Sequence, residues 1–213
     1  MAVGLLLVRN RATGSISHRF LVWNLALAWI PLGAALLADR WADRRLRLVA
    51  AGAIWLIFFP NSPYLITDLI HLRVDAQVPI WYDAVLYVSF GFTGIMLGNA
   101  SLYLVQSAVR RTYGVLVSWI VAAVSLGLGS FGVYLGRVER WNSWDLLHRP
   151  AVLFQAAARP FVDPFGNERA VVMSIVFFGF LLTAYQASYA LASQHRLQPV
   201  SLLDTARGEG FGQ

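Results

Sequence analysis

The run AVLYVSFGFTGIMLGNASLYLVQSAV, residues 84–109, contains no charged side chain and is long enough to cross a lipid bilayer as one helix. A transmembrane helix needs about 20 predominantly apolar residues. A helix at the surface of a soluble protein would instead show a polar face that recurs with the helical period, and this run does not. The stretch therefore predicts a membrane-spanning helix.

Four further uncharged runs of similar length lie elsewhere in the chain, at residues 20–38, 48–67, 112–136 and 170–194. The composition agrees with them, because 58% of the residues are hydrophobic and only 13% are charged. A soluble domain of 213 residues would not need five such runs. We expect a single integral membrane domain over 1–213, folded as an all-α polytopic transmembrane bundle of about five spans.

The charged residues and the missing cysteines exclude several classes of function. All 17 basic residues are arginine, they give a net charge of +6, and they lie mainly between the spans. In that position they suit anionic lipid headgroups, so the expected partner is the lipid bilayer and not nucleic acid. Without cysteine, disulfides and thiolate metal sites are excluded, and any metal would need histidine and carboxylate ligands.

The segments outside the spans differ in length and character. Residues 1–8 are apolar but too short to span, and residues 204–213 form a Gly-rich polar end that we expect to be a flexible tail. The loop at 137–169 is too long for a plain connection, so we expect it to carry structure at the interface. Pro150 predicts a helix through residue 158 on the membrane surface, ended by Pro160 and the turn at 163–166.

Small residues repeat at four-residue spacing inside three of the predicted spans. The positions are Gly94 and Gly98, Gly132 and Gly136, and the set Ala184, Ser188 and Ala192. This spacing lets helix backbones approach closely, so it predicts packing positions. The polar residues inside the spans, Asn24, Asn99, Gln106 and Gln186, are interpreted as hydrogen bonds between helices.

Five spans place the second and fourth loops on the same side of the membrane. The short loops at 39–47 and 110–111 carry arginines, which favours the cytoplasmic side for them. The second and fourth loops, which hold the unusual polar residues, would then face outward.

The first polar cluster follows a proline-rich break, PNSPYLITDLIHL at 60–72. If the stretch after Pro63 is helical, Tyr64, Thr67, Asp68 and His71 share one face. The cluster fits an amphipathic helix end with its polar side in water. It equally fits an acid/base pair or a divalent metal site formed by Asp68 and His71, a spacing that permits this chemistry without specifying it.

The second polar cluster is YLGRVERWNSWD at 134–145. One interpretation is structural: Asn142 or Ser143 caps a following helix, Asp145 favours its first turn, and Trp144 anchors at the headgroups. The other is a fork formed by Arg137 and Arg140, which suits phosphate or carboxylate.

Three motifs carry a resemblance to a known family: NLALAWIP at 24–31, FPNSPYLITD at 59–68, and YLGRVERWNSWD at 134–145. The chain resembles, over about residues 20–190, the bacterial multi-pass membrane family catalogued as domain of unknown function 1361. The resemblance implies a wholly helical domain in the bacterial inner membrane and brings no established activity or cofactor. Relatives tend to have one more span at the N-terminus, so residues 1–8 would be a remnant of a six-span plan.

Three functional hypotheses remain open from the sequence. The first is a membrane enzyme acting on a lipid or lipid-linked anionic headgroup at the outer interface, and the others are a transporter or substrate-binding component and a non-catalytic assembly protein. The enzyme hypothesis gives catalytic roles to Asp68, His71 and Asp145, with Asp68 and His71 as acid/base groups or as possible ligands of a divalent metal. Its candidate substrate-binding residues are Asn61, Tyr64, Thr67, Asp83, Tyr134, Arg137, Arg140, Asn142, Ser143 and Trp144.

Overall fold

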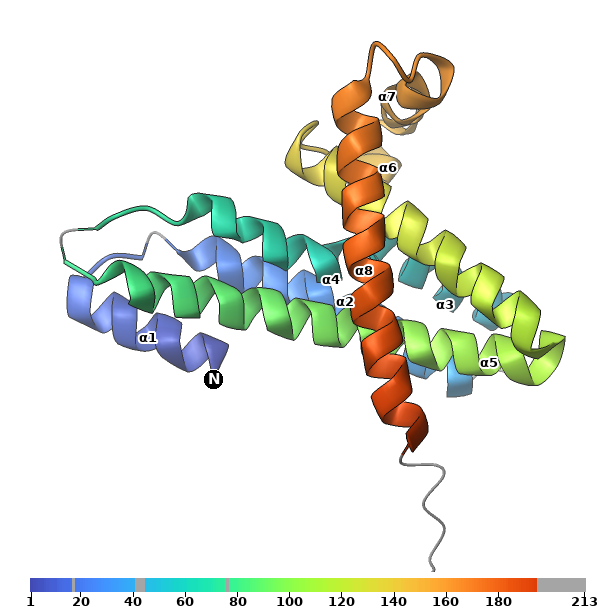
Figure 1. Ribbon diagram of the computed structural model, residues 1–213, viewed down its shortest axis with the longest axis horizontal. Helices are drawn as coiled ribbons and strands as arrows, with labels where there is room; N and C mark the ends of the chain where they lie inside the picture. Colours follow the sequence, from blue (N-terminus) through green and yellow to red (C-terminus); the bar gives the residue numbers. More distant parts are fainter. Residues whose placement is uncertain (17, 41–44, 76, 195–213) are drawn as a thin grey trace, which may run out of the picture.

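A computed structural model describes all residues except 17, 41–44, 76 and 195–213 (Figure 1). In the described part of the chain the secondary structure consists of helices joined by turns and loops, as predicted, and contains no strand. In chain order the elements are α1 (Ala2–Thr13), α2 (Arg19–Arg40), α3 (Arg45–Phe58), α4 (Asn61–Tyr64), the 3-10 helix η1 (Leu65–His71), α5 (Ile80–Arg137), α6 (Asp145–His148), α7 (Pro150–Val162) and α8 (Glu168–Gln194).

Four helical stretches of the described chain are long and apolar enough to cross a membrane: Arg19–Ala38, Val49–His71, Ile80–Arg137 and Glu168–Ser193. The third corresponds to two of the five predicted spans, because α5 has a non-helical residue, Gly114, within its 58 residues. Figure 1 shows the two arms of α5, residues 80–113 and 115–137, folded back on one another at this point. Gly114 has a φ of 87°, a conformation that favours glycine, so the reversal lies here and not at Arg110 and Arg111, where we expected the loop.

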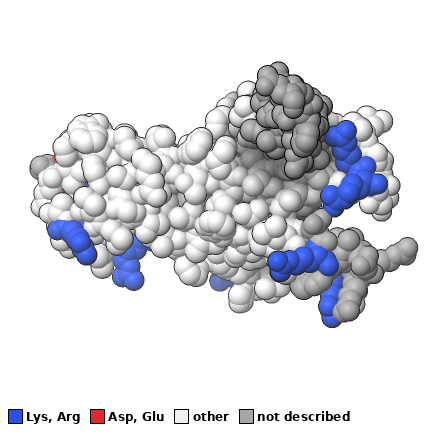
Figure 2. All heavy atoms as spheres, turned by 90° about the horizontal axis from the view of Figure 1, so that it is seen from below, with Lys and Arg blue, Asp and Glu red and all other residues white. Residues whose placement is uncertain are grey.

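Much of the surface that faces outward from these helices is uncharged. Figure 2 shows that arginine side chains lie mainly toward the two ends of the face it presents, with uncharged surface between them. Large apolar side chains such as Val88, Phe92 and Leu116 are exposed on α5. A band of exposed apolar residues is the surface that lipid chains cover, which agrees with a membrane protein.

The broken segment between α3 and η1 is held between the two arms of α5. A Cβ atom added at Gly94 would lie 2.3 Å from the Ser62 carbonyl oxygen, and one added at Gly132 would lie 2.5 Å from Cγ of Pro60. At Gly136 the nearest atom would be Cε2 of Tyr64, at 3.1 Å. The prediction that the spaced glycines are packing positions is therefore confirmed, and both arms use them to contact the proline-containing segment.

The stretch after Pro63 is helical, and Tyr64, Thr67, Asp68 and His71 share one face as predicted, but most of the stretch is not α-helical. It forms a short α-helical turn, α4, and then continues as a 3-10 helix over η1. Pro60 and Pro63 lack backbone N–H groups, so the regular α-helical hydrogen-bond pattern cannot pass through both positions.

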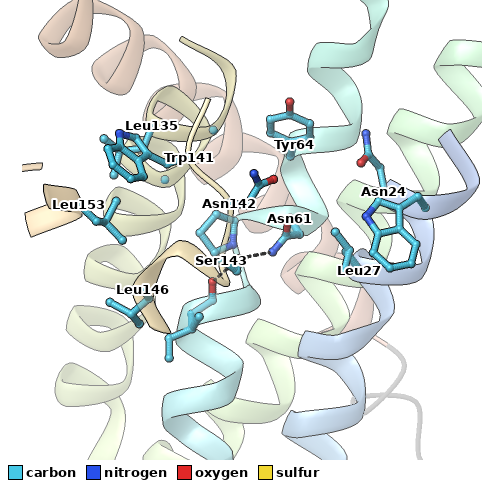
Figure 3. A pocket seen from close by; sticks show the side chains of 15 residues that line it. Asn24, Leu27, Asn61, Tyr64, Leu135, Trp141, Asn142, Ser143, Leu146 and Leu153 are labelled. Carbon is cyan, nitrogen blue, oxygen red and sulfur yellow. Dashed lines mark hydrogen bonds between the residues drawn. The ribbon is translucent and has the colours of Figure 1, made fainter. Parts of the chain in front are cut away.

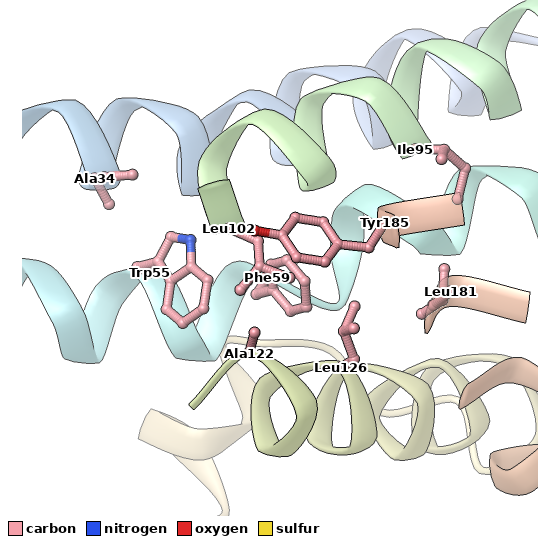
Figure 4. Close-up of a cluster of buried hydrophobic side chains, with 10 residues drawn as sticks. Ala34, Trp55, Phe59, Ile95, Leu102, Ala122, Leu126, Leu181 and Tyr185 are labelled. Carbon is pink, nitrogen blue, oxygen red and sulfur yellow. The ribbon is translucent and has the colours of Figure 1, made fainter. Parts of the chain in front are cut away.

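An apolar core joins α2, α3, both arms of α5 and α8 (Figure 4). Its buried members include Trp55 and Phe59 from the second span, Leu126 from the second arm, and Tyr185 from α8. Asn99 ties α8 to the first arm, since its side-chain N–H donates to the Ala184 carbonyl (3.2 Å) and the Ser188 hydroxyl (2.8 Å). The interpretation of Asn99 as an interhelical hydrogen bond is confirmed.

Residues 2–8 belong to a short helix, α1, which packs beside α2, η1 and the first arm of α5 through Leu6 and its neighbours. Arg9 of this helix is buried and donates two hydrogen bonds to Asp83, at 2.6 and 2.9 Å, and one to Asp75, at 3.0 Å. The backbone N–H of Gln77 and the Arg9 guanidinium together hold the pKa of Asp75 below its ordinary value. An ion-pair clasp thus attaches α1 to the bundle.

The long loop is structured, as expected, although its details differ. Helix α7 opens at Pro150 but runs to Val162, so Pro160 lies in its last turn and does not end it. The helix α6 before it begins at Asp145 and has Trp144 at its N-cap position, so neither Asn142 nor Ser143 caps it. The predicted tail at 204–213 lies outside the described residues.

Candidate functional site

Arg137 brings the two polar clusters of the sequence together. Its Nη2 donates to Oδ1 of Asp68 at 2.5 Å, and both Nε and Nη2 donate to the Thr67 hydroxyl oxygen, at 2.8 and 2.6 Å. The residue ends the second arm of α5, while Thr67 and Asp68 lie on η1. The convergence of the second and fourth loops that topology predicts is therefore present in these contacts.

The Asp68 carboxylate has a partner for each oxygen. Its second oxygen, Oδ2, accepts a hydrogen bond from the side-chain amide of Asn24 on α2, at 3.0 Å. The side chain is only 1% exposed, and that of Arg137 is 12% exposed. Burying both charges costs several kcal/mol per ion, and the close pairing and extra hydrogen bonds offset that cost. Asp68 is thus an anchor for Arg137 and is closed to solvent.

His71 and Tyr64 complete the surroundings of Arg137. The Nη1 of Arg137 lies 3.2 Å from Nε2 of His71. Since guanidinium only donates, this hydrogen bond requires an unprotonated Nε2 and places the ring proton of a neutral His71 on Nδ1. The guanidinium carbon also lies 4.2 Å from the centre of the Tyr64 ring, a cation–π contact. Unlike Asp68, His71 is exposed and can reach a ligand.

Asn61 and Ser143 cap the break at the end of α3. The Asn61 side-chain amide donates to the Phe58 carbonyl at 3.0 Å and to the Ser143 hydroxyl at 2.9 Å. The Ser143 hydroxyl donates to the Ile57 carbonyl at 3.2 Å. The last carbonyls of a helix lack intrahelical partners, so these side chains satisfy groups that the prolines would otherwise leave open. They also attach the 137–145 segment to the break.

A pocket of about 240 Å³ opens beside the capped break (Figure 3). Its polar wall contains Asn24, Asn61, Tyr64, Asn142 and Ser143, and its apolar wall contains the side chains of Leu27, Ile57, Leu135, Leu146 and Leu153. Figure 3 shows Asn61 and Ser143 between Leu146 on one side and Asn24 on the other. Every one of the 15 lining residues is uncharged. Such a mixture fits a molecule that has both a hydroxyl- or amide-bearing group and an apolar portion.

A second hollow shares Trp141 and Asn142 with this pocket and supplies the charge that the pocket lacks. It is lined by Arg140 and Arg149 together with Glu139, Asp145 and His148. Arg140 is exposed and has a φ of 61°. Arg137 and Arg140 therefore have different surroundings and do not form the predicted fork: Arg137 contacts Asp68, and Arg140 lines the open hollow.

The other candidate residues have separate partners. Asp83 pairs with Arg9 at the α1 clasp and does not contact Asp68. The Tyr134 hydroxyl donates to Glu139 at 3.0 Å, and the Asp145 carboxylate accepts from the Asn142 backbone N–H at 2.7 Å. Trp144 lies against Trp23, with ring centres 6.0 Å apart.

The described residues contain no group of three histidine, cysteine, aspartate or glutamate side chains placed to hold a metal ion. Asp68 and His71 both bind the Arg137 guanidinium, which occupies the position between them. A metal at this pair would have to displace Arg137.

Asn24 is the site residue that sequence reasoning missed, since we interpreted it only as a hydrogen bond between helices. It both binds Asp68 and lines the pocket. Its position within the NLALAWIP motif was the signal that could have identified it. Trp141 was also missed, although its indole Nε1 is buried beside the pocket without a hydrogen-bond partner among the described residues.

Comparison with known proteins identifies one family. The family model described as "Protein of unknown function (DUF1361)" matches residues 23–184, a range that includes all three motifs and ends within α8. Neither the curated proteins nor the solved structures contain a match.

Proposed function

This chain belongs to the family described as Protein of unknown function (DUF1361), and we propose that it is a membrane enzyme that binds a lipid or lipid-linked anionic headgroup at the outer membrane–water interface. The observation that carries the proposal is the position of the 240 Å³ pocket between two sets of polar residues. Asn24 and Tyr64 connect it with the Asp68–Arg137 network, and Trp141 and Asn142 connect it with the hollow that contains Arg140 and Arg149.

The two hollows suit different parts of one amphipathic molecule. The amide and hydroxyl groups of Asn61, Asn142 and Ser143 can hydrogen-bond an uncharged polar group, and the leucines can contact the start of an apolar chain. Arg140 and Arg149 can each hydrogen-bond an oxygen of a phosphate or carboxylate, although Glu139 and Asp145 line the same hollow. A headgroup that lies across both hollows would use all of these groups.

His71 is the residue that we propose for acid/base chemistry. It is exposed, so its ring can reach a ligand, and its Nε2, which lies 3.2 Å from Nη1 of Arg137, is the ring nitrogen that would take up a proton if a bound anion drew the guanidinium away. Asp68 acts through Arg137 and is a positioning residue, because its two oxygens are already bound. This differs from the sequence hypothesis, which gave Asp68 and His71 equal roles.

A non-catalytic assembly role is the second candidate, and a specific observation favours it. Asp68, Asn61 and Ser143 each have internal partners that explain their presence without a ligand. The transporter hypothesis has less support, because it relied on open backbone groups at the proline break, where the Ile57 and Phe58 carbonyls are bound.

Lipid turnover by the purified full-length protein tests the proposal. The protein would be placed in vesicles made from a total bacterial lipid extract, and lipid species would be followed by mass spectrometry. We expect a time-dependent product that falls by about 100-fold or more with His71→Ala, as for loss of an acid/base group. Gln155→Ala, at an exposed position on α7, is the control and should leave the rate unchanged.

A binding measurement separates the two candidate functions. Leu153→Trp fills the pocket, so it should remove any lipid that copurifies with the protein. If the wild-type protein turns over no lipid, and if the Leu153→Trp protein copurifies with the same lipid as the wild-type protein, the enzyme proposal is wrong and the assembly role is favoured.

A further inference from the structure

A second polar cavity, of about 510 Å³, lies between the first arm of α5 and the end of α8. It is lined by Tyr103, Gln106, Ser107, Arg110, Arg111, Tyr189 and Ser193. None of these residues lines the 240 Å³ pocket or the hollow that contains Arg140 and Arg149. The cavity is therefore a separate feature of the bundle.

The lining of this cavity is rich in hydrogen-bond donors, and the described residues that form it include no carboxylate. Arg110 and Arg111 contribute two positive charges, and the tyrosines and serines contribute hydroxyl groups. The Arg110 guanidinium donates to the Tyr189 hydroxyl at 2.9 Å, which leaves four of its five N–H groups without a hydrogen bond to a described residue. A site with this balance of charge and donors favours an anion, and two arginines are suited to the oxygens of a phosphate.

Gln106 provides an independent indication that the cavity receives a ligand. The residue is only 2% exposed, and its side-chain oxygen accepts a hydrogen bond from the Tyr185 hydroxyl. Its Nε2 is buried without a hydrogen-bond partner among the described residues. An unpaired buried donor costs about 1–3 kcal/mol, so a ligand oxygen at this position would be stabilising.

The place of the cavity along the spans indicates the source of the anion. Arg110 lies four residues before the reversal at Gly114, and Ser193 is the last residue of the apolar stretch of α8. Tyr103 and Tyr189 pack edge to face nearby, with ring centres 5.7 Å apart. Arginine and tyrosine at the ends of apolar spans are characteristic of the membrane–water boundary, where phospholipid phosphates lie.

We propose that this cavity binds the phosphate of an anionic phospholipid, with Arg110 and Arg111 holding the charge and Gln106 donating from its floor. The site is independent of the proposed headgroup enzyme, since the two share no residue. It would fix the lipid at the end of the bundle where α8 meets the first arm of α5.

Native mass spectrometry of the full-length protein in neutral detergent tests the site. Phosphatidylglycerol would be titrated against the wild-type protein and Arg110→Gln, with Arg11→Gln as the matched control at an exposed arginine of α1 that lines none of the cavities described above. We expect Arg110→Gln to weaken phosphatidylglycerol binding about tenfold or more, because a charged hydrogen-bonding group is lost, while Arg11→Gln binds phosphatidylglycerol as the wild-type protein does. Arg111→Gln serves as a second variant if Arg110→Gln does not fold.

Two further titrations, with phosphatidylcholine and with inorganic phosphate, identify the ligand. Phosphatidylcholine carries a phosphate without net negative charge, and inorganic phosphate carries charge without lipid chains. The proposal expects both to bind at least tenfold more weakly than phosphatidylglycerol. The proposal is wrong if phosphatidylcholine binds as tightly as phosphatidylglycerol, or if inorganic phosphate alone saturates the site. It is also wrong if Arg110→Gln and Arg111→Gln both bind phosphatidylglycerol as tightly as the wild-type protein.

Discussion

Arg137 loses most of its hydration in this bundle, because its side chain is 12% exposed and its neighbours occupy its donor groups. A buried guanidinium is tolerated only where its charge and its N–H groups are matched. Asp68 supplies the charge, and Thr67 and His71 supply further acceptors. The network therefore has a structural role even before any ligand binds.

Removing one partner of the buried pair should destabilise the protein strongly. Asp68→Ala leaves Arg137 without its counter-ion, so we expect the free energy of unfolding to fall by about 3–5 kcal/mol. The measurement is unfolding in mixed micelles by SDS titration, followed by circular dichroism. Arg140→Ala, at the exposed arginine of the same segment, should change it by less than about 0.5 kcal/mol.

A double-mutant cycle completes this test. If the pair is coupled, Asp68→Ala combined with Arg137→Met should be less destabilising than the sum of the two single changes. Additive changes would show that the 2.5 Å contact contributes no coupling free energy and would contradict the ion pair.

Among the elements, α5 and the proline break depend on one another. The break needs partners that can approach its irregular backbone closely, and the arms of α5 present glycines at the positions of closest approach. Gly94 faces the Ser62 carbonyl and Gly132 faces Pro60. The reversal at Gly114 brings these two glycine rows to opposite sides of the same segment.

Adding one methyl group at this contact should therefore be costly. In Gly94→Ala the new Cβ would lie 2.3 Å from a backbone oxygen, so α4 or α5 must shift, and we expect a loss of at least about 1–3 kcal/mol of unfolding free energy. Gly52→Ala in α3 is the matched control, because nothing lies within 4 Å of its added Cβ. That change should be neutral or stabilising by up to about 1 kcal/mol. Equal effects of the two substitutions in SDS titration would exclude close packing at Gly94.

At the scale of the whole molecule, the number of crossings decides which loops share a side. If both arms of α5 cross the membrane, residues 72–79 and the 137–167 segment lie on one side, and the reversal near Gly114 lies on the other. If α5 crossed only once, the first two segments would lie on opposite sides. The pocket contacts agree with two crossings, since Asn61 and Ser143 meet across these elements.

Cysteine labelling tests both the crossings and the orientation, because the native chain has no cysteine. Gln77→Cys and Gln155→Cys are exposed positions and should react with a membrane-impermeant maleimide added outside right-side-out vesicles. Thr112→Cys, also exposed, should react only after the vesicles are opened. Reaction of Gln77→Cys and Gln155→Cys on opposite sides would contradict two crossings by α5. Reaction of both only after opening would reverse the orientation and leave the crossing number intact.

Much of the fold could be predicted from the order of residues, because the relevant signals are local. Uncharged runs predicted the long helices, since a bilayer requires about 20 apolar residues per crossing. Pro60 and Pro63 predicted a break, because they lack N–H groups, and the spaced glycines predicted close packing. The 3-10 form of η1 and the reversal at Gly114 were not predicted, because each depends on neighbouring elements as well as local propensity.

The sequence by itself determined an all-helical membrane domain and two clusters of polar residues, because hydrophobic length and motif spacing are readable along the chain. The tertiary structure decided which residues of those clusters meet. Asp83 pairs with Arg9 of α1, whereas Asp68 pairs with Arg137 of a segment 69 positions away. Contacts at such separations depend on how the arms of α5 enclose the proline break, and no local pattern encodes that geometry.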